Sequence, residues 1–133
     1  MRILVIYCHP VETSYNAALH DEVVRNLRAA GHEVDDCDLY AEDFNPVLSR
    51  EERLGYHEVP SNRLPVQGYV DRLLQAEAVV FCFPTWCFGM PAMLSPGSTG
   101  SRRWLRASTS SKAGSLAGSG AAVAGFCMSD HLI

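Results

Sequence analysis

The segment ILVIYCHPVETSYNAAL, residues 3–19, carries the first fold signal of this sequence. Its opening part, Ile3–Cys8, is a short apolar run rich in β-branched side chains, which is typical of a buried strand. His9 and the proline after it end that run, and Thr13 or Ser14 can then cap a helix. We therefore predict a strand that passes through a polar loop into a helix.

The helix and the next strand are predicted from their apolar spacing. Three apolar side chains share one helical face, namely Leu19, Val23 and Leu27. Gly31 stands where a left-handed residue is needed to end the helix. His32–Leu39 is the second strand candidate, and residues 40–64 are expected to be a long connection with one helical turn around Ser49–Leu54.

A further helix and strand follow. Pro65 is well placed to begin a helix that carries Val66, Tyr69, Val70, Leu73 and Leu74. Ala78–Phe83 is a continuous apolar run suited to a strand buried on both faces, and Pro84 is expected to stop it. Pro91–Leu94 looks like the first turn of another helix. This alternation predicts an α/β fold with a doubly wound parallel sheet.

Composition narrows the class of protein. The 133 residues suit one domain, and 47% apolar with 20% charged residues is an ordinary globular balance. A net charge of −4 argues against a nucleic-acid surface. No apolar run is long enough to span a membrane, and the N-terminal run is too short for a signal peptide, so we expect a cytoplasmic protein. Five irregularly spaced cysteines are expected to be reduced thiols.

The composition changes abruptly after Leu94. Residues 1–94 hold 14 acidic residues, 7 Arg and 3 Ser, whereas residues 95–133 hold 1 acidic residue, 4 basic residues and 9 Ser. We expect residues 1–94 to form the N-terminal part of an α/β domain and residues 95–133 to be a Ser/Gly-rich tail. Within the tail, residues 121–128 are a candidate for a short fourth strand.

Two loops are expected to form a binding site where the strand order reverses. If the first and third strands are neighbours, His9–Asn16 and Pro84–Gly89 lie side by side beyond their carboxyl ends. Hydroxyl and amide groups at a helix N-terminus suit a phosphate, while Trp86 and Phe88 suit a flat aromatic ring. Together these features describe a nucleotide or flavin site. The simpler alternative is that the first loop only caps a helix and that the aromatic residues only pack.

The two loops carry a family resemblance. HPxxxSYNxAL at residues 9–19 and PxxxFGxPAxL at residues 84–94 resemble the NAD(P)H:quinone oxidoreductase family, which has the flavodoxin-like fold with strand order 2-1-3-4-5. The resemblance implies FAD, with FMN as the alternative, NAD(P)H as electron donor, a quinone or similar acceptor, and a homodimer. It also implies a ping-pong reaction in which hydride passes through flavin N5.

The predicted cofactor-binding residues come from both loops. From the residues and the resemblance they are His9, Thr13, Ser14, Tyr15, Asn16, Ala17, Ala18, Pro84, Thr85, Trp86, Cys87 and Phe88. The Asp-Arg pair and the later Tyr and His of the family are not found after Leu94, so the sheet is expected to be incomplete after its third strand and no catalytic residue is assigned. An impaired enzyme, a non-catalytic binding module and an inactive remnant with a shifted reading frame all remain open.

No catalytic or metal-binding role is predicted for the remaining cysteines, histidines and acidic residues. Cys82 and Cys87 with His9 form only a lone C-x4-C pattern, and no metal site is predicted. His20, His32 and His57 are expected at the surface. The acidic cluster Asp35, Asp36 and Asp38 lacks calcium-loop spacing and is expected to be a solvated strand edge.

Overall fold

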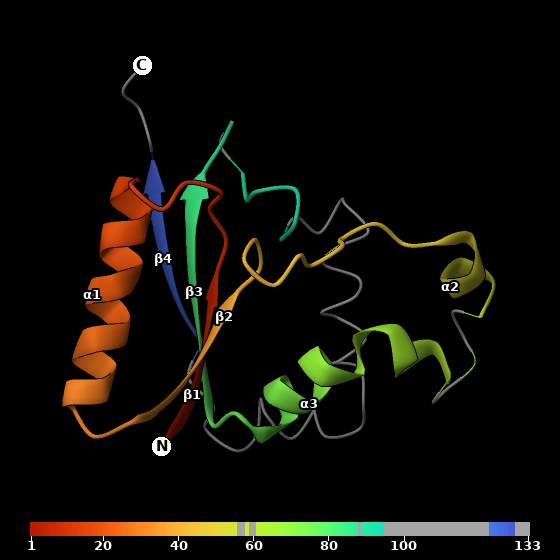
Figure 1. Cartoon of the computed structure of the whole chain (residues 1–133), viewed down its shortest axis with the longest axis horizontal. Coiled ribbons are helices and arrows are strands. Elements are labelled where there is room, and N and C mark those ends of the chain that lie inside the picture. Colours follow the sequence, from red (N-terminus) through yellow and green to blue (C-terminus); the bar gives the residue numbers. More distant parts are fainter. Residues whose placement is uncertain (56–57, 59–60, 88, 95–122, 130–133) are drawn as a thin grey trace.

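The fold is a parallel sheet with helices against it, seen in a computed structural model that describes residues 1–55, 58, 61–87, 89–94 and 123–129. The strands are β1 (Arg2–Tyr7), β2 (Glu33–Asp38), β3 (Ala78–Thr85) and β4 (Val123–Ser129). The helices are α1 (Tyr15–Ala29), α2 (Arg50–Leu54) and α3 (Gln67–Gln75), with a 3-10 helix at Ser61–Val66 before α3. The described strands are ordered β2-β1-β3-β4, and all neighbours are parallel (Figure 1).

β1 is an interior strand of the sheet. In its register, Val5 lies opposite Asp36 of β2 on one side and Val80 of β3 on the other. Because successive side chains of a strand point to opposite faces, β1 contributes to two apolar cores. Ile3, Val5 and Tyr7 join one cluster, and Leu4, Ile6 and Cys8 join the other. This explains why the segment reads as an unbroken apolar run rather than an alternating one.

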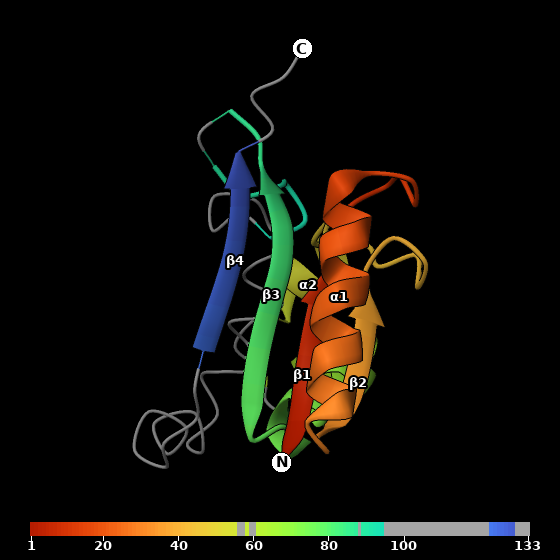
Figure 2. The same cartoon turned by 90° about the vertical axis from the view of Figure 1, so that its left-hand side faces the viewer.

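α1 covers the face formed by the first of these clusters (Figure 2). Its N-cap is Ser14, whose Oγ accepts a hydrogen bond from Ala17 N at 3.1 Å. At its other end Gly31 has a φ of +83°, and its N–H donates to the Arg28 carbonyl while His32 N–H donates to Leu27. This is the Schellman arrangement, so the predicted start and end of the helix are both confirmed.

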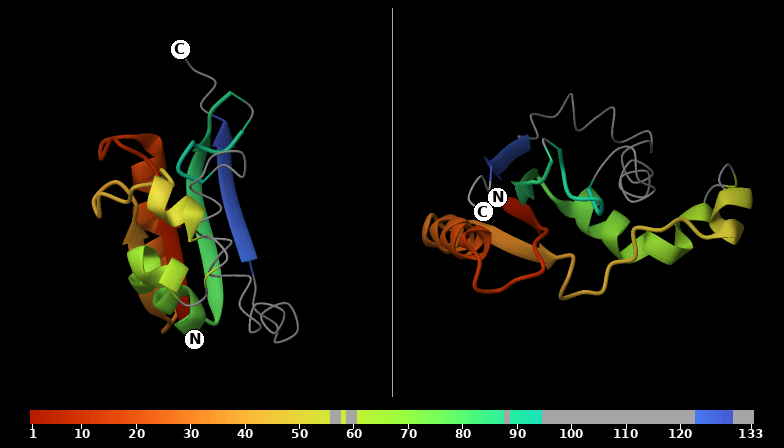
Figure 3. Two further views of the ribbon diagram at one scale, coloured as in Figure 1. Left: turned by 90° about the vertical axis from the view of Figure 1, so that its right-hand side faces the viewer. Right: turned by 90° about the horizontal axis from the view of Figure 1, so that it is seen from above.

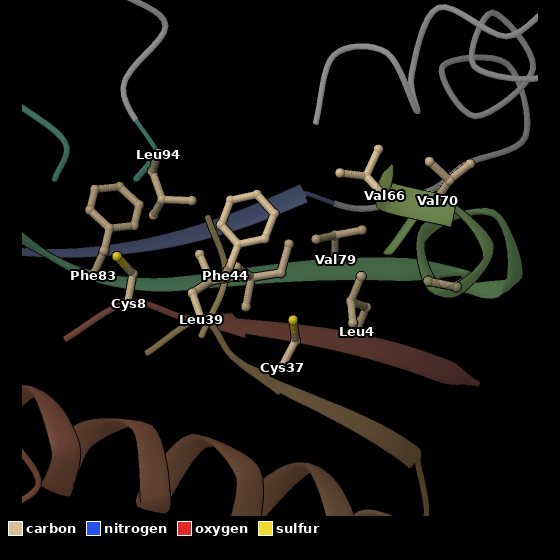
Figure 4. Close-up of a cluster of buried hydrophobic side chains, with 12 residues drawn as sticks. Leu4, Cys8, Cys37, Leu39, Phe44, Val66, Val70, Val79, Phe83 and Leu94 are labelled. Carbon is tan, nitrogen blue, oxygen red and sulfur yellow. The ribbon is translucent and has the colours of Figure 1, made fainter. Parts of the chain in front are cut away.

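The opposite face of the sheet packs against α3 and the 3-10 helix (Figure 3). Val66 and Val70 from these helices meet Leu4 of β1 and Val79 of β3, as Figure 4 shows. Phe44 joins the same cluster, and its ring packs edge-on against Tyr69 with centroids 5.0 Å apart. α2, the predicted helical turn, carries a Ser49 capping box and contributes no buried residue. No described helix is long and apolar enough to cross a membrane.

The buried face of α1 differs from the predicted one. The predicted residues Leu19, Val23 and Leu27 are only partly buried, whereas Asn16, Ala17, His20 and Val24 are buried. The prediction that His20 lies at the surface is therefore wrong. The apolar spacing misses it because His20 is held by polar contacts as well as by packing, as described below.

β3 runs beyond its predicted end. Pro84 was expected to stop the strand, but β3 continues through Thr85. The last described pair between β1 and β3 joins Tyr7 and Cys82, so Pro84 lies past the end of β1. On that side the missing N–H of proline costs no ladder hydrogen bond, while β4 still pairs with β3 opposite Pro84 and Thr85.

The fourth strand forms close to its predicted position. β4 pairs with β3 from Val79 opposite Val123 to Thr85 opposite Ser129. The described residues hold no fifth strand, as expected for an incomplete version of the 2-1-3-4-5 order. Pro91–Leu94 forms a single turn closed by Leu94 N–H and the Pro91 carbonyl. Residues 95–122 and 130–133, most of the predicted tail, lie outside the described residues, and the division at residue 94 stays a prediction.

The acidic residues of β2 are not a freely solvated edge. Asp35 receives both Nε and Nη2 of Arg72 from α3, at 3.0 and 2.8 Å. Asp36 bonds to His20, and Asp38 accepts the N–H groups of Tyr40 and Ala41. The edge position was predicted correctly, but each carboxylate has a specific partner that the local sequence does not reveal.

Candidate functional site

The loops that follow β1 and β3 lie next to each other because those strands are paired in parallel. Their juxtaposition is direct at one point, where the rings of His9 and Trp86 lie 5.7 Å apart at an angle of 55°. The two loops leave the same edge of the sheet, at the top of Figure 1. Residues 77 positions apart in the sequence therefore border one site, as the predicted strand order requires.

The first loop ends in a helix N-terminus with unused donors. Ser14 accepts hydrogen bonds from Ala17 N at Oγ and from Ala18 N at its carbonyl. Within the described chain, no acceptor is bonded to the backbone N–H of Tyr15 or Asn16. These free N–H groups and the positive end of the helix dipole favour an anion.

A buried side-chain donor lies at the same turn. Asn16 is only 2% exposed, and its Nδ2 has no hydrogen-bond partner among the described residues. A buried amide without a partner costs free energy, so this donor is suited to a ligand acceptor. The predicted residues Thr13, Tyr15 and Ala18 are exposed around it, and Ala17 is buried beneath it.

His9 is fixed by the loop that it begins. Its Nδ1 accepts a hydrogen bond from Val11 N–H at 3.1 Å, and the half-buried ring is thereby turned toward Trp86. The Ser14 N–H in turn donates to the Val11 carbonyl at 3.3 Å. The loop between β1 and α1 is therefore held by its own hydrogen bonds.

The second loop presents an aromatic side chain on a tight turn. Trp86 and Gly89 exchange backbone hydrogen bonds of 3.0 and 2.9 Å, and Cys87 between them has a φ of +49°. Trp86 is 37% exposed, Thr85 is half-buried and Pro84 is fully buried. Phe88, also predicted as a site residue, lies outside the described residues. Trp86 offers the flat partly exposed surface on which an aromatic ring can stack.

The thiols near the site differ in burial. Burial raises the pKa of Cys8 to about 12 and that of Cys82 to about 11, so both are inert at neutral pH. Cys87 is exposed on the second loop. Cys82 points into the core of the sheet rather than toward Cys87, and the described residues hold no group of three side chains with metal-ligand character.

Sequence similarity shows which family this chain belongs to. The sequence model described as flavodoxin-like fold matches residues 1–95. This chain belongs to the flavodoxin-like fold family. NAD(P)H dehydrogenase (quinone) 1 of Rattus norvegicus is 33% identical over an alignment of 109 positions, which covers 70% of this chain and 40% of the rat protein.

Solved structures agree with the fold. Smu.1420 from Streptococcus mutans UA159 is 36% identical with a TM-score of 0.62, over 77% of this chain and 52% of that one. An NAD(P)H:quinone oxidoreductase from Methanothermobacter marburgensis has a TM-score of 0.67 at 18% identity and covers 99% of this chain and 86% of its own. The predicted flavodoxin-like fold is thus confirmed. The chain spans less than half of the rat relative.

Two residues near this candidate site were not predicted to belong to it. Tyr7 and His20 are buried side by side beneath the Ser14 cap, with ring centroids 4.2 Å apart. Tyr7 lies on the α1 face of β1, and strand alternation alone would have placed it there. His20 lies one turn beyond Asn16 on the same helical face. Because histidine is polar, the sequence alone predicts that this side chain is exposed.

Proposed function

We propose that this chain binds a flavin and acts in an NAD(P)H:quinone-type oxidoreductase. The observation that carries the proposal is the unpartnered Nδ2 of buried Asn16 beside the free N–H groups of Tyr15 and Asn16. These donors suit a phosphate, and Trp86 suits a flat ring one loop away. The names of the relatives support the reaction class.

Two groups of residues fit the two ends of a flavin. Ser14, Tyr15 and Asn16 would hold the phosphate end, and Trp86 with the turn at Cys87 would contact the ring. When bound, a flavin accepts hydride from NAD(P)H and passes two electrons to a quinone-type acceptor. The protein's own part is to orient the cofactor with fixed donors and an aromatic surface.

The finer assignments belong to the same proposal. We take FAD as the cofactor and FMN as the alternative, to be distinguished by mass spectrometry of the released flavin. The cytoplasm is the proposed compartment, since the four described cysteines are free thiols. The family resemblance implies a homodimer, but the segments that complete the site across that dimer correspond to positions beyond residue 94, so we propose that this chain does not form it. A stable dimer in sedimentation at micromolar concentration would contradict this.

Asn16→Asp tests where the phosphate binds. A carboxylate at this position would repel the phosphate, so we expect flavin affinity to fall at least about tenfold. Flavin fluorescence titration measures this, and thermal unfolding checks that the variant is folded. Asn26→Asp is the matched control, because Asn26 lies on the exposed side of the same helix.

Two outcomes would contradict the proposal. Equal flavin affinity in Asn16→Asp and the wild type would refute the phosphate position. A folded wild-type chain that binds neither FAD nor FMN would refute the flavin function itself. Flavin binding without oxidation of NAD(P)H in the presence of a quinone would instead indicate a binding module.

A further inference from the structure

A stacked pair of polar side chains is buried between α1 and the sheet. The ring of His20 on α1 lies against the ring of Tyr7 on β1, with centroids 4.2 Å apart and planes 11° from parallel. His20 is 8% exposed and Tyr7 is 4% exposed. The surrounding cluster is otherwise apolar or small, including Val5, Ala17 and Val24.

His20 also connects α1 to the edge strand. Its Nε2 lies 2.8 Å from Asp36 Oδ1 on β2, and its Nδ1 lies 3.9 Å from Asp21 Oδ1 on α1. With Nε2 protonated, the imidazole donates a charge-assisted hydrogen bond to Asp36. This bond fixes the imidazole ring plane, and the stacked Tyr7 ring is aligned with it.

Tyr7 extends the contact to the cap of α1. Its hydroxyl is buried beside Ser14 and makes no hydrogen bond of regular geometry among the described residues. Burial raises the pKa of this phenol, with the neighbouring Ser14 hydroxyl opposing the rise, so the group is neutral. Ser14 Oγ is the atom that caps Ala17 N, next to the free N–H groups of Tyr15 and Asn16.

The arrangement is one continuous series of contacts. It runs from Asp36 through His20 and Tyr7 to Ser14, whose hydroxyl lies beside the Tyr7 hydroxyl, and so from β2 to the turn where α1 begins. A leucine or phenylalanine at either buried ring position would pack without a polar group to desolvate. The hydrogen bond to Asp36 compensates for the burial of His20, whereas the Tyr7 hydroxyl is buried without a regular partner, so packing alone does not account for it.

We propose that His20 and Tyr7 are positioning residues, which hold the Ser14 cap and thereby set the affinity of the α1 N-terminus for a phosphate-bearing ligand. The inference rests on the proposed flavin function for the identity of that ligand. Neither residue contacts the ligand in this proposal, since both lie beneath the turn. Their effect passes through the orientation of Ser14 Oγ and of the adjacent N–H groups.

Tyr7→Phe distinguishes an effect of Tyr7 on ligand affinity from an effect on folding stability. The substitution keeps the stacked ring and removes only a buried hydroxyl without a regular partner, so the fold is expected to be as stable or more stable. FMN affinity is nevertheless expected to fall three- to tenfold, since Ser14 loses its neighbour. A purely structural role for Tyr7 predicts that affinity and stability change together, and that result would overturn the proposal.

His20→Gln tests the positioning role against a matched histidine. Glutamine still donates to Asp36 but lacks the ring that stacks on Tyr7, and His32→Gln removes a histidine near the opposite end of α1. FMN affinity is expected to fall at least threefold in His20→Gln and to stay at the wild-type value in His32→Gln. Equal affinities in all three proteins would refute the proposal.

A measurement without ligand separates this inference from the proposed function. Amide hydrogen exchange at Ala17 reports the Ser14 cap directly. His20→Gln and Tyr7→Phe should exchange at least threefold faster there than the wild type and His32→Gln. If the wild type binds no flavin, the proposed function falls. Unchanged exchange at Ala17 in both variants would then refute the positioning role by itself.

Discussion

Arg72 is predicted to be the side chain whose loss most weakens the attachment of α3 to the sheet edge. Its Nε and Nη2 donate to Asp35, its Nη1 donates to Glu42 at 2.8 Å, and its Nη2 also donates to the Asp36 carbonyl. These hydrogen bonds raise the pKa of Arg72, those to Asp35 most strongly. One guanidinium therefore joins α3, β2 and the loop after β2.

The size of the expected stability loss follows from how deeply Arg72 and its carboxylate partners are buried. The side chains of Arg72, Asp35 and Glu42 are 23%, 21% and 34% exposed, so water screens their interaction only in part. Hydrogen bonds to charged groups contribute about 1.5–3 kcal/mol each, and removing one partner of a buried ion pair costs about 3–5 kcal/mol. Allowing for partial exposure, we expect Arg72→Met to lower the free energy of unfolding by about 3 kcal/mol.

Urea denaturation measures this loss, and Arg25→Met is the matched control. Arg25 pairs with Glu22 on the exposed side of α1, so its replacement should change stability little, and 1 M salt should remove even that difference. The deficit of Arg72→Met should persist in 1 M salt because its carboxylate partners are partly buried. Equal stabilities of the two variants at both salt concentrations would refute this reasoning.

The remaining predictions concern the thiols and the glycines. Burial raises the pKa of three thiols: Cys8 to about 12, Cys37 to about 12 and Cys82 to about 11. The unfolded chain loses these thiol protons at lower pH than the folded chain does. The stability that the buried thiols contribute should therefore be fully present below about pH 8.5 and be lost as the pH rises toward 11–12. A urea denaturation midpoint that does not change over that pH range would contradict this. In a Cys127→Ser background, Cys87 alone should react with iodoacetamide before unfolding, and mass mapping of the modified thiols checks it. Gly31→Ala should cost about 1 kcal/mol because φ is +83°, whereas Gly68→Ala in α3 meets no atom within 4 Å and should stabilise slightly by thermal unfolding.

The sequence by itself determined the parts of the fold that depend on local chemistry. The apolar run at residues 3–8, the cap at Ser14 and the left-handed residue at Gly31 each have a local cause, and each is found where it was predicted. The parallel sheet followed from the alternation of strands and helices, whereas the strand order came from the family resemblance. The juxtaposition of the two loops follows from that order.

Only the tertiary structure decided how polar groups are paired across distance. Asp35 and Arg72 are 37 residues apart, and Asp36 and His20 are 16 apart, so no periodicity connects them. The extension of β3 through Pro84 likewise depends on where β1 ends, which proline's own preference does not encode. Hydrophobic patterning records which faces are buried, whereas a buried polar residue is tolerated only when a partner from another element reaches it. That is why His20 was predicted at the surface and is found in the core.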